Sequence, residues 1–401
     1  MTAFDLLLLA FKAVTIASIP LALVYVGRAT RHGGDRLRRL AWVTTFITFD
    51  LIVFGGFTRL TDSGLGCPDW PGCYAKANPL AAAEAIHGAE ALAPTGPVTM
   101  AKAWIEMIHR YLAMAVGLLI IAMLVWSVLR WRARRRSRTT SSAAFPGATA
   151  GLLALVVVQG AFGAWTVTQR LQPIFVSIHL LLGNALLAAL VWHALRFERL
   201  GPDRRTSPGP VGLPSGGLRA FALVGALVLT AQIALGGWVS SNYAVLACSD
   251  FPTCHGQWIP PMDFAAGFQL WRPLGRTAAG DFLPAEALTA IHWLHRNFAV
   301  VVVLVFGSLA WRVRRLDGLR ASAKAIGLLL VAQALTGTIN VVFAWPLVAA
   351  VLHNAGAAGL VVATVVINYR LATGTGTLVP ASAAAPSLSV ARLQSVRGAR
   401  S

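Results

Sequence analysis

The stretch Ile105–Tyr111, Ile-Glu-Met-Ile-His-Arg-Tyr, opens a long apolar run and places Glu106, His109 and Arg110 near one end of it. A related stretch, Ala290–Phe298, opens a later apolar run with Ala-Ile-His-Trp-Leu-His-Arg-Asn-Phe. Ionisable side chains inside an apolar span are costly and usually serve a function. The recurrence of a His-Arg pair therefore indicates two related sites within a membrane-spanning fold.

The composition is that of a membrane protein. Of the 401 residues, 56% are hydrophobic and 12% are charged, and the mean hydropathy is +0.66. Soluble domains carry about 25% charged residues, so we expect an all-α polytopic membrane protein surrounded by lipid. The formal charge of +19 does not indicate a nucleic-acid partner, because most Lys and Arg lie in short segments between apolar runs, where they determine topology.

Nine apolar runs are long enough to cross a bilayer, for which about 20 residues suffice. Helices are expected in all of them, because lipid offers no partners to the backbone polar groups. The predicted spans are Phe4–Val26, Leu37–Thr58, Trp104–Leu129, Pro146–Thr168, Ile174–Leu195, Leu218–Ser240, Ala287–Trp311, Ser322–Ala344 and Leu347–Tyr369.

Basic residues predict the orientation of these spans. Segments 28–39, 130–145, 196–219 and 312–324 and the tail from 370 together hold 25 of the 34 Lys and Arg residues. The positive-inside rule assigns these segments to the cytoplasm. We therefore expect a bacterial cell inner-membrane protein with its amino terminus outside and its carboxyl terminus in the cytoplasm.

Eight of the spans form two similar halves, whereas the first span has no later counterpart. Gly55-Gly56 matches Gly236-Gly237, and Cys67–Cys73 matches Cys248–Cys254 with identical spacing. Four crossings per half predict two parallel four-helix repeats in an eight-helix bundle, related by an axis along the membrane normal. The predicted parts are an extra amino-terminal transmembrane helix with its linker (1–36), an amino-terminal half (37–196), a cytoplasmic linker (197–217), a carboxyl-terminal half (218–370) and a disordered cytoplasmic tail (371–401).

Four histidines lie at similar depth in four spans that run in the same direction: His109, His179, His295 and His353. Each follows its helix start by about 5 to 8 residues, or roughly 8–12 Å at the α-helical rise. Two imidazoles per half suit two bis-histidine haems, each held between facing helices. A lone membrane histidine is more often a hydrogen-bonded core residue, but four in matched positions favour axial ligation of haem iron. Zinc is disfavoured, because no carboxylate or cysteine recurs at this depth in both halves.

Charged residues beside these histidines have two interpretations each. Arg110 and Arg296 are candidate partners of haem propionates, through charge-assisted hydrogen bonds, or arginines that snorkel to the interface. Glu106 lies one helical turn before His109, and His292 takes its place in the second half. The carboxylate is a candidate catalytic group that accepts a proton or stabilises charge, or else a simple partner for Arg110.

All four cysteines lie in the two long segments on the predicted outer side, an oxidising compartment in bacteria. The simplest pairing is within each segment, Cys67 with Cys73 and Cys248 with Cys254. Such short loops remove little entropy from the unfolded chain. Disulfides here therefore shape the outer segments or exchange electrons, with the structural role favoured.

The sequence resembles the haem A synthase family, membrane enzymes that make haem A from haem O. The motifs that carry the resemblance cover roughly residues 38–369. They are Gly55-Gly56-Phe57-Thr58-Arg59-Leu60-Thr61, Ser63-Gly64-Leu65, Cys67-Pro68-Asp69-Trp70-Pro71 and Glu106-Met107-Ile108-His109-Arg110, together with His179, His295 and His353.

The resemblance implies a role for each site residue. His109 and His179 would face the substrate haem O in the amino-terminal half, and His295 and His353 would hold a haem b cofactor in the other half. Glu106 matches the essential carboxylate of the family. Cys67–Cys73 matches its outer disulfide, whereas a second pair such as Cys248–Cys254 is not universal there.

The implied reaction oxidises one methyl group of haem O to a formyl group by successive hydroxylations, giving haem A for terminal oxidases. Haem O synthase is the implied donor of the substrate. Two other functions explain part of the sequence: a dihaem b-type electron-transfer protein linked to quinol, and a quinone-dependent thiol oxidase that uses the outer cysteines. The electron acceptor, the source of the inserted oxygen and the oligomeric state, a homo-oligomer included, stay open.

Overall fold

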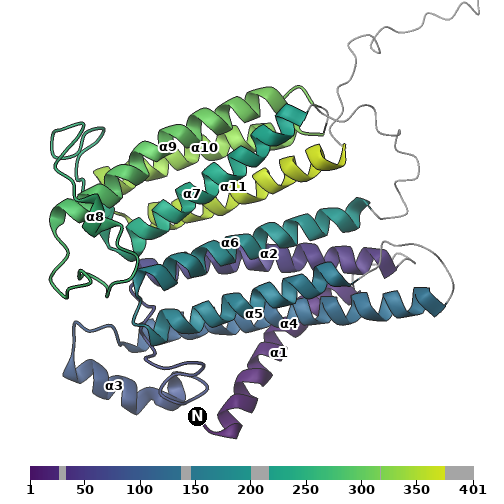
Figure 1. The fold of residues 1–401 in the computed structure, drawn as a ribbon. Coiled ribbons are helices and arrows are strands. Elements are labelled where there is room, and N and C mark those ends of the chain that lie inside the picture. The colour runs from purple at the N-terminus through teal and green to yellow at the C-terminus, as the bar shows by residue number, and fades with distance from the viewer. Residues whose placement is uncertain (27–32, 137–145, 200–215, 317, 375–401) are drawn as a thin grey trace, which may run out of the picture.

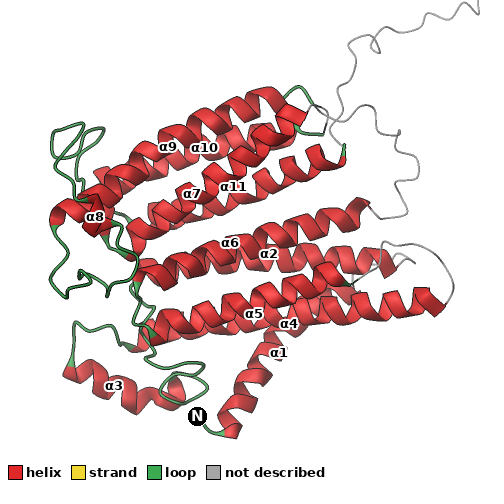
Figure 2. Ribbon diagram, in the orientation of Figure 1, coloured by secondary structure: helices red, strands yellow, loops and turns green. Residues whose placement is uncertain are grey.

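The computed structural model describes residues 1–26, 33–136, 146–199, 216–316 and 318–374 (Figure 1). Within these residues the chain is all-helical, with 77% helix and no strand (Figure 2). The predicted fold class is thereby confirmed. The tail was predicted to be disordered from residue 371, but residues 371–373 continue the last long helix. The rest of the predicted tail from 375, and most of the predicted linker at 197–217, lie outside the described residues.

Nine long helices in the described residues are apolar enough to cross a membrane. They are α1 (Ala3–Val26), α2 (Gly33–Leu60), α4 (Met100–Arg136), α5 (Gly147–Thr168), α6 (Pro173–Arg199), α7 (Gly216–Ser241), α9 (Ala285–Val313), α10 (Arg320–Val342) and α11 (Leu347–Thr373). All nine predicted spans are confirmed. Several helices extend beyond the apolar run, because a helix continues past the hydrocarbon wherever its backbone bonds can still form.

Short helices in the connecting segments were not predicted. They are α3 (Ala83–Leu92), α8 (Phe264–Gly267) and two 3₁₀ turns, η1 (Leu80–Ala82) and η4 (Ala244–Leu246). His87 lies in α3. The segment is Ala-rich with Glu84 in its first turn, but it is too short for periodicity to distinguish it from a loop.

The spanning helices pack in two groups of four. In the first group α2, α4, α5 and α6 contact one another in a ring, and in the second α7, α9, α10 and α11 do so. Contacts of α6 with α7, and of α11 with α2 and α6, join the groups (Figure 1). Each group has its own apolar core. Their parallel, duplicated relationship and the boundaries at 37–196 and 218–370 stay predictions.

Small and polar residues form the junction between the groups. The Asn354 amide donates to the Ile52 carbonyl over 3.2 Å, and a side chain at Gly56 would collide with that amide. The Arg59 guanidinium, at the end of α2, donates to the Ser240 carbonyl over 2.6 Å. Close packing of small residues with interhelical hydrogen bonds is the usual way in which membrane helices associate.

The two cysteine-containing segments lie at the same end of the bundle, which we call the loop side (Figure 2). Helix α1 begins at this end and packs against α4 and α2. The prediction that both segments share one side is thus confirmed, whereas the assignment of that side to the cell exterior stays a prediction.

Candidate functional site

Each of the four histidines packs its ring against a glycine on the preceding long helix. The pairs are His109 on α4 with Gly55 on α2, His179 on α6 with Gly163 on α5, His295 on α9 with Gly236 on α7, and His353 on α11 with Gly337 on α10. A methyl group added at these glycines would lie 2.9 to 3.3 Å from the nearest ring atom. The glycines thus let the helix backbones approach the imidazoles closely.

These glycines show that the histidines share a level near the loop side. Each of the four glycines lies five residues before the last residue of its helix. The helix starts are a poorer guide, because α4 begins at Met100 and α9 at Ala285, earlier than predicted. His109 and His295 therefore lie further into their helices than we expected, while the shared level is retained.

The histidines lie in pairs within each group of helices. His109 is near His179, and His295 is near His353. All four residues are only partly buried, so part of each stays accessible. This arrangement fits the predicted pairing of one imidazole from each of two facing helices.

Hydrogen bonds define the tautomer of two of the rings. Nδ1 of His179 lies 3.2 Å from the Gln159 carbonyl. A carbonyl only accepts, so Nδ1 carries the proton and Nε2 of the neutral ring has the free lone pair. A metal-binding imidazole is usually held by such a bond.

The matching histidine in the second group is held in an equivalent way. Nδ1 of His353 lies 3.0 Å from the Thr336 hydroxyl, and this hydroxyl donates its own proton to the Ala332 carbonyl over 2.7 Å. His353 must therefore donate through Nδ1, which leaves its Nε2 lone pair free. In contrast, Nδ1 of His295 is buried without a partner among the described residues.

The donor set therefore fits a bis-histidine haem in each group. Two neutral nitrogens per group are the axial ligands that haem iron takes, and the glycines let each imidazole pack closely against the neighbouring helix. The unpartnered ring nitrogen of His295 is a buried polar atom that calls for an explanation. Haem ligation supplies a reason for four such rings in apolar helices.

We expect Gly163→Ala to destabilise the protein, because its methyl group would lie 2.9 Å from the ring of His179. Overpacking of this kind costs about 1–3 kcal/mol. Gly160, one turn earlier on α5, has open space around it, so Gly160→Ala is the matched control and should raise stability slightly. Thermal unfolding of detergent-solubilised protein measures both changes, and equal melting temperatures for the two variants would contradict the packing seen here.

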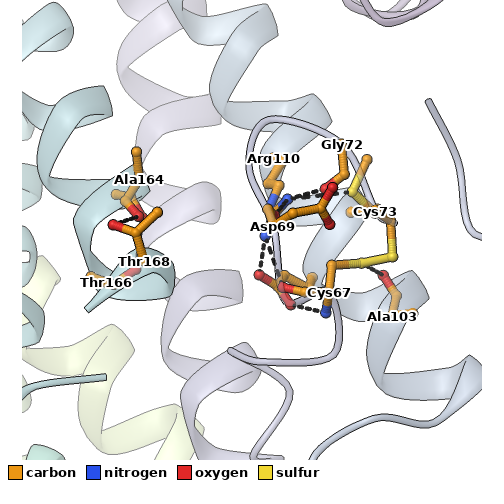
Figure 3. Close-up of polar contacts among 12 residues, drawn as sticks. Cys67, Asp69, Gly72, Cys73, Ala103, Arg110, Ala164, Thr166 and Thr168 are labelled. Atoms are coloured by element: carbon orange, nitrogen blue, oxygen red, sulfur yellow. Dashed lines mark hydrogen bonds and ion pairs between the residues drawn. A yellow bond between two sulfur atoms is a disulfide. The ribbon is translucent and has the colours of Figure 1, made fainter. Parts of the chain in front are cut away.

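Glu106 is held by two donors on the loop side. It is buried, accepts a 2.7 Å hydrogen bond from the Cys67 backbone N–H and forms an ion pair with Arg110. The Arg110 guanidinium also donates to the carbonyls of Asp69 and Gly72, inside the loop that the first disulfide closes (Figure 3). Glu106 and Arg110 thus hold the loop onto α4.

The second group repeats this arrangement with a different residue. Nδ1 of His292 accepts from the Cys248 N–H over 3.1 Å, as Glu106 does from Cys67. Arg296 donates to the carbonyls of Asp250 and Thr253, each over 3.0 Å. Glu106 and His292 therefore have one structural role in common, and only the carboxylate adds a buried ion pair.

Sequence reasoning missed this loop-holding role, although the matched positions of the cysteines and the His-Arg pairs were visible. The structure places the guanidinium groups of Arg110 and Arg296 on loop carbonyls. Their predicted contact with haem propionates stays a prediction. The alternative interpretation of Glu106, as a partner of Arg110, describes a contact that is present.

Both predicted disulfides are present, Cys67–Cys73 and Cys248–Cys254, and all four cysteines are buried. The second loop is closed further by Asp250, whose carboxylate accepts from the Thr253 hydroxyl and from the N–H groups of Gly256 and His255. These donors hold the pKa of Asp250 well below its usual range. The loops are thus compact, hydrogen-bonded units.

Two further histidines among the described residues lie away from the paired rings. His193, buried near the opposite end of α6, lies 3.2 Å from the Thr149 hydroxyl, a contact that fits a structural role. His255 is exposed in the second loop, and His32 lies outside the described residues.

Comparisons with known proteins converge on one family. Residues 38–365 match the COX15-CtaA family, described as cytochrome oxidase assembly protein. A protein named heme A synthase from Shewanella oneidensis is 37% identical over 336 residues, which is 83% of this chain and 97% of the relative. Another of that name from Methylobacterium radiotolerans is 29% identical over 90% of this chain and 96% of the relative. A third, from Sphingopyxis alaskensis, is 29% identical over 84% and 92%.

Proposed function

Since the chain belongs to the COX15-CtaA family of cytochrome oxidase assembly proteins, we propose that it is a haem A synthase, an oxidoreductase that converts haem O into haem A. The observation that carries this proposal is the pairing of four histidines in two groups of helices, with a carboxylate beside only one pair. One substrate and one cofactor of the same chemical kind require two similar sites with different surroundings.

The four histidines divide between substrate and cofactor. His109 and His179 bind haem O, and His295 and His353 hold haem b, which supplies one-electron redox chemistry when bound. The hydrogen bonds of His179 to Gln159 and of His353 to Thr336 support ligation in both halves, because they leave Nε2 free as a ligand, and the presence of Glu106 in the first half alone supports the division. Arg110 and Arg296 remain candidates for propionate contacts in addition to their loop carbonyls.

Glu106 serves the substrate site. A buried carboxylate fixed by two donors can accept a proton or stabilise positive charge that develops on the substrate. The position of Glu106 one turn from His109 supports this role. His292, its counterpart, has no charge to offer when neutral, which fits a second site that does not change its haem.

Pigment conversion tests the proposal. The chain is produced in a bacterial host together with haem O synthase, the expected donor of substrate, and pigments extracted from the purified protein are identified by chromatography and mass spectrometry. Haem b with haem O and haem A supports the synthase. Haem b alone, with haem O unchanged in the membrane, would support the dihaem electron carrier, and a haem-free protein would support the thiol oxidase.

The proposal also includes a cellular location and a set of partners. We place it in the bacterial inner membrane with the loop side outside, where disulfides persist. Its partners are membrane lipid, haem O synthase and an electron acceptor of unassigned chemistry, with a homo-oligomer as one possible assembly and no nucleic acid.

A further inference from the structure

Helix α1 contacts the segment that contains the first disulfide, residues 67–77, which we call the first disulfide loop. Nζ of Lys12 donates to the Ala77 carbonyl over 3.3 Å and lies 3.3 Å from the Tyr111 hydroxyl. The Tyr111 hydroxyl donates to the same carbonyl over 2.6 Å. Lys12 also lies 4.9 Å from the centre of the Tyr111 ring, so the ammonium group joins α1, α4 and the loop at one point.

A second side chain of α1 holds the other polar group of the same residue. Oδ1 of Asp5 accepts from the Ala77 N–H over 3.3 Å, and the Asp5 carboxylate is itself held by the Thr2 hydroxyl at 2.5 Å. Ala77 is completely buried and Asp5 is 7% exposed. Both backbone groups of Ala77 are thus bound by α1, and loss of the buried bond to Asp5 would leave the Ala77 N–H without its partner.

Among the described residues, the loop of the second disulfide, residues 248–258, receives no such contact from outside its own group of helices. Trp258 follows Cys254 at the spacing by which Ala77 follows Cys73, and its carbonyl accepts from Nε1 of Trp293, on α9, over 2.8 Å. The carbonyl at this position therefore accepts a side-chain hydrogen bond in both loops. Within the part of the chain that the structure describes, the first loop alone is also bound by Asp5 and Lys12 of α1.

The anchored loop is the one that supports Glu106. Its Cys67 N–H donates to the carboxylate, and its Asp69 and Gly72 carbonyls accept from Arg110. A shift of the loop would therefore change both partners of Glu106. No acidic side chain among the described residues forms an ion pair with Lys12, so the loop carbonyl and Tyr111 are its partners in an apolar helix, where an ionisable residue usually has a function.

We propose that α1 clamps the first disulfide loop, and that Asp5 and Lys12 are positioning residues for Glu106. The clamp is a property of the structure alone, whereas its effect on catalysis rests on the proposed haem A synthase function. The Glu106 site needs this support more than the His292 site. A charged carboxylate must keep its hydrogen-bond donors in place during a reaction, whereas His292 is a neutral acceptor.

The reactivity of the two disulfides tests the clamp. Cys67 and Cys73 are fully buried and the second pair almost so, so a thiol reductant reaches either bond only when its loop opens. Full-length protein in nanodiscs is exposed to a mild reductant, the reaction is quenched by alkylation, and mass spectrometry gives both rates. Cys248–Cys254 is the reference within the same molecule.

We expect Lys12→Met and Asp5→Ala each to speed reduction of Cys67–Cys73 about fivefold to tenfold relative to Cys248–Cys254, since each removes a hydrogen bond to the backbone of Ala77. Lys12→Arg keeps the donor and should stay near the wild-type ratio. Lys102→Met, which removes a lysine at the start of α4, is the matched control and should leave the ratio unchanged. Asp5→Ala keeps the test valid if Lys12→Met fails to fold.

Two results would overturn the clamp: an unchanged ratio in both variants, or equal acceleration of the two bonds, which would report general loosening. A raised ratio with wild-type haem A formation would retain the clamp and refute the positioning role. Wild-type protein that cannot convert haem O would refute the proposed function, while the ratio would still decide the clamp.

Discussion

Alanine at His295 or His353 will remove the resident haem from the purified protein, whereas alanine at His109 or His179 will leave that haem in place and stop haem A formation. In the proposed assignment each pair of histidines would hold one haem, so loss of either imidazole would leave that haem with a single protein ligand. We expect resident haem to fall to less than about a tenth of wild type in the first two variants. In the other two, turnover should fall at least about 100-fold, because the substrate loses its position.

Absorption spectra and pigment extraction of the four purified variants measure this division. His193→Ala is the matched control, because it removes a buried imidazole from α6, the helix of His179, but from the opposite end, where the ring contacts Thr149. It should keep both the haem and the turnover. Loss of the resident haem in His109→Ala, with retention in His295→Ala, would reverse the assignment of the two halves.

Replacement of Glu106 by glutamine will lower both turnover and stability. The change keeps the size of the side chain and an acceptor for the Cys67 N–H, but it removes the charge that pairs with Arg110. Both side chains are buried, at 5% and 8% exposure, and breaking a buried pair costs about 3–5 kcal/mol. Arg110 would still donate to the loop carbonyls. We therefore expect the loss of unfolding free energy to lie near the lower of these values.

Glutamine at the matching position of the second group separates the effect on turnover from the effect on stability. His292→Gln also replaces the acceptor of a cysteine N–H, but it breaks no ion pair, so we expect a loss of only about 1 kcal/mol and near-normal turnover. Thermal unfolding and haem O conversion are measured on both variants. Full turnover in Glu106→Gln would show that the carboxylate holds the loop and takes no part in the chemistry.

The sequence alone sufficed for the membrane fold and for the pairing of the cysteines. Nine spans, four histidines in matched spans and two cysteine pairs were all predicted, and the spans and disulfides are confirmed. The physical reason is that these are local properties. The length of an apolar run decides whether it can cross lipid, and cysteines six residues apart in one loop are near neighbours in any fold.

Only the tertiary structure decided how these residues are supported. Glu106 reaches Cys67 across 39 residues of sequence, and Lys12 reaches Ala77 across 65. The glycine beside each imidazole lies on another helix. Such contacts depend on how helices pack and rotate against one another, which the apolar pattern of a membrane span hardly constrains, because lipid accepts nearly any apolar face. For that reason the shared task of Glu106 and His292, and the attachment of α1 to the first disulfide loop, became visible only in the folded chain.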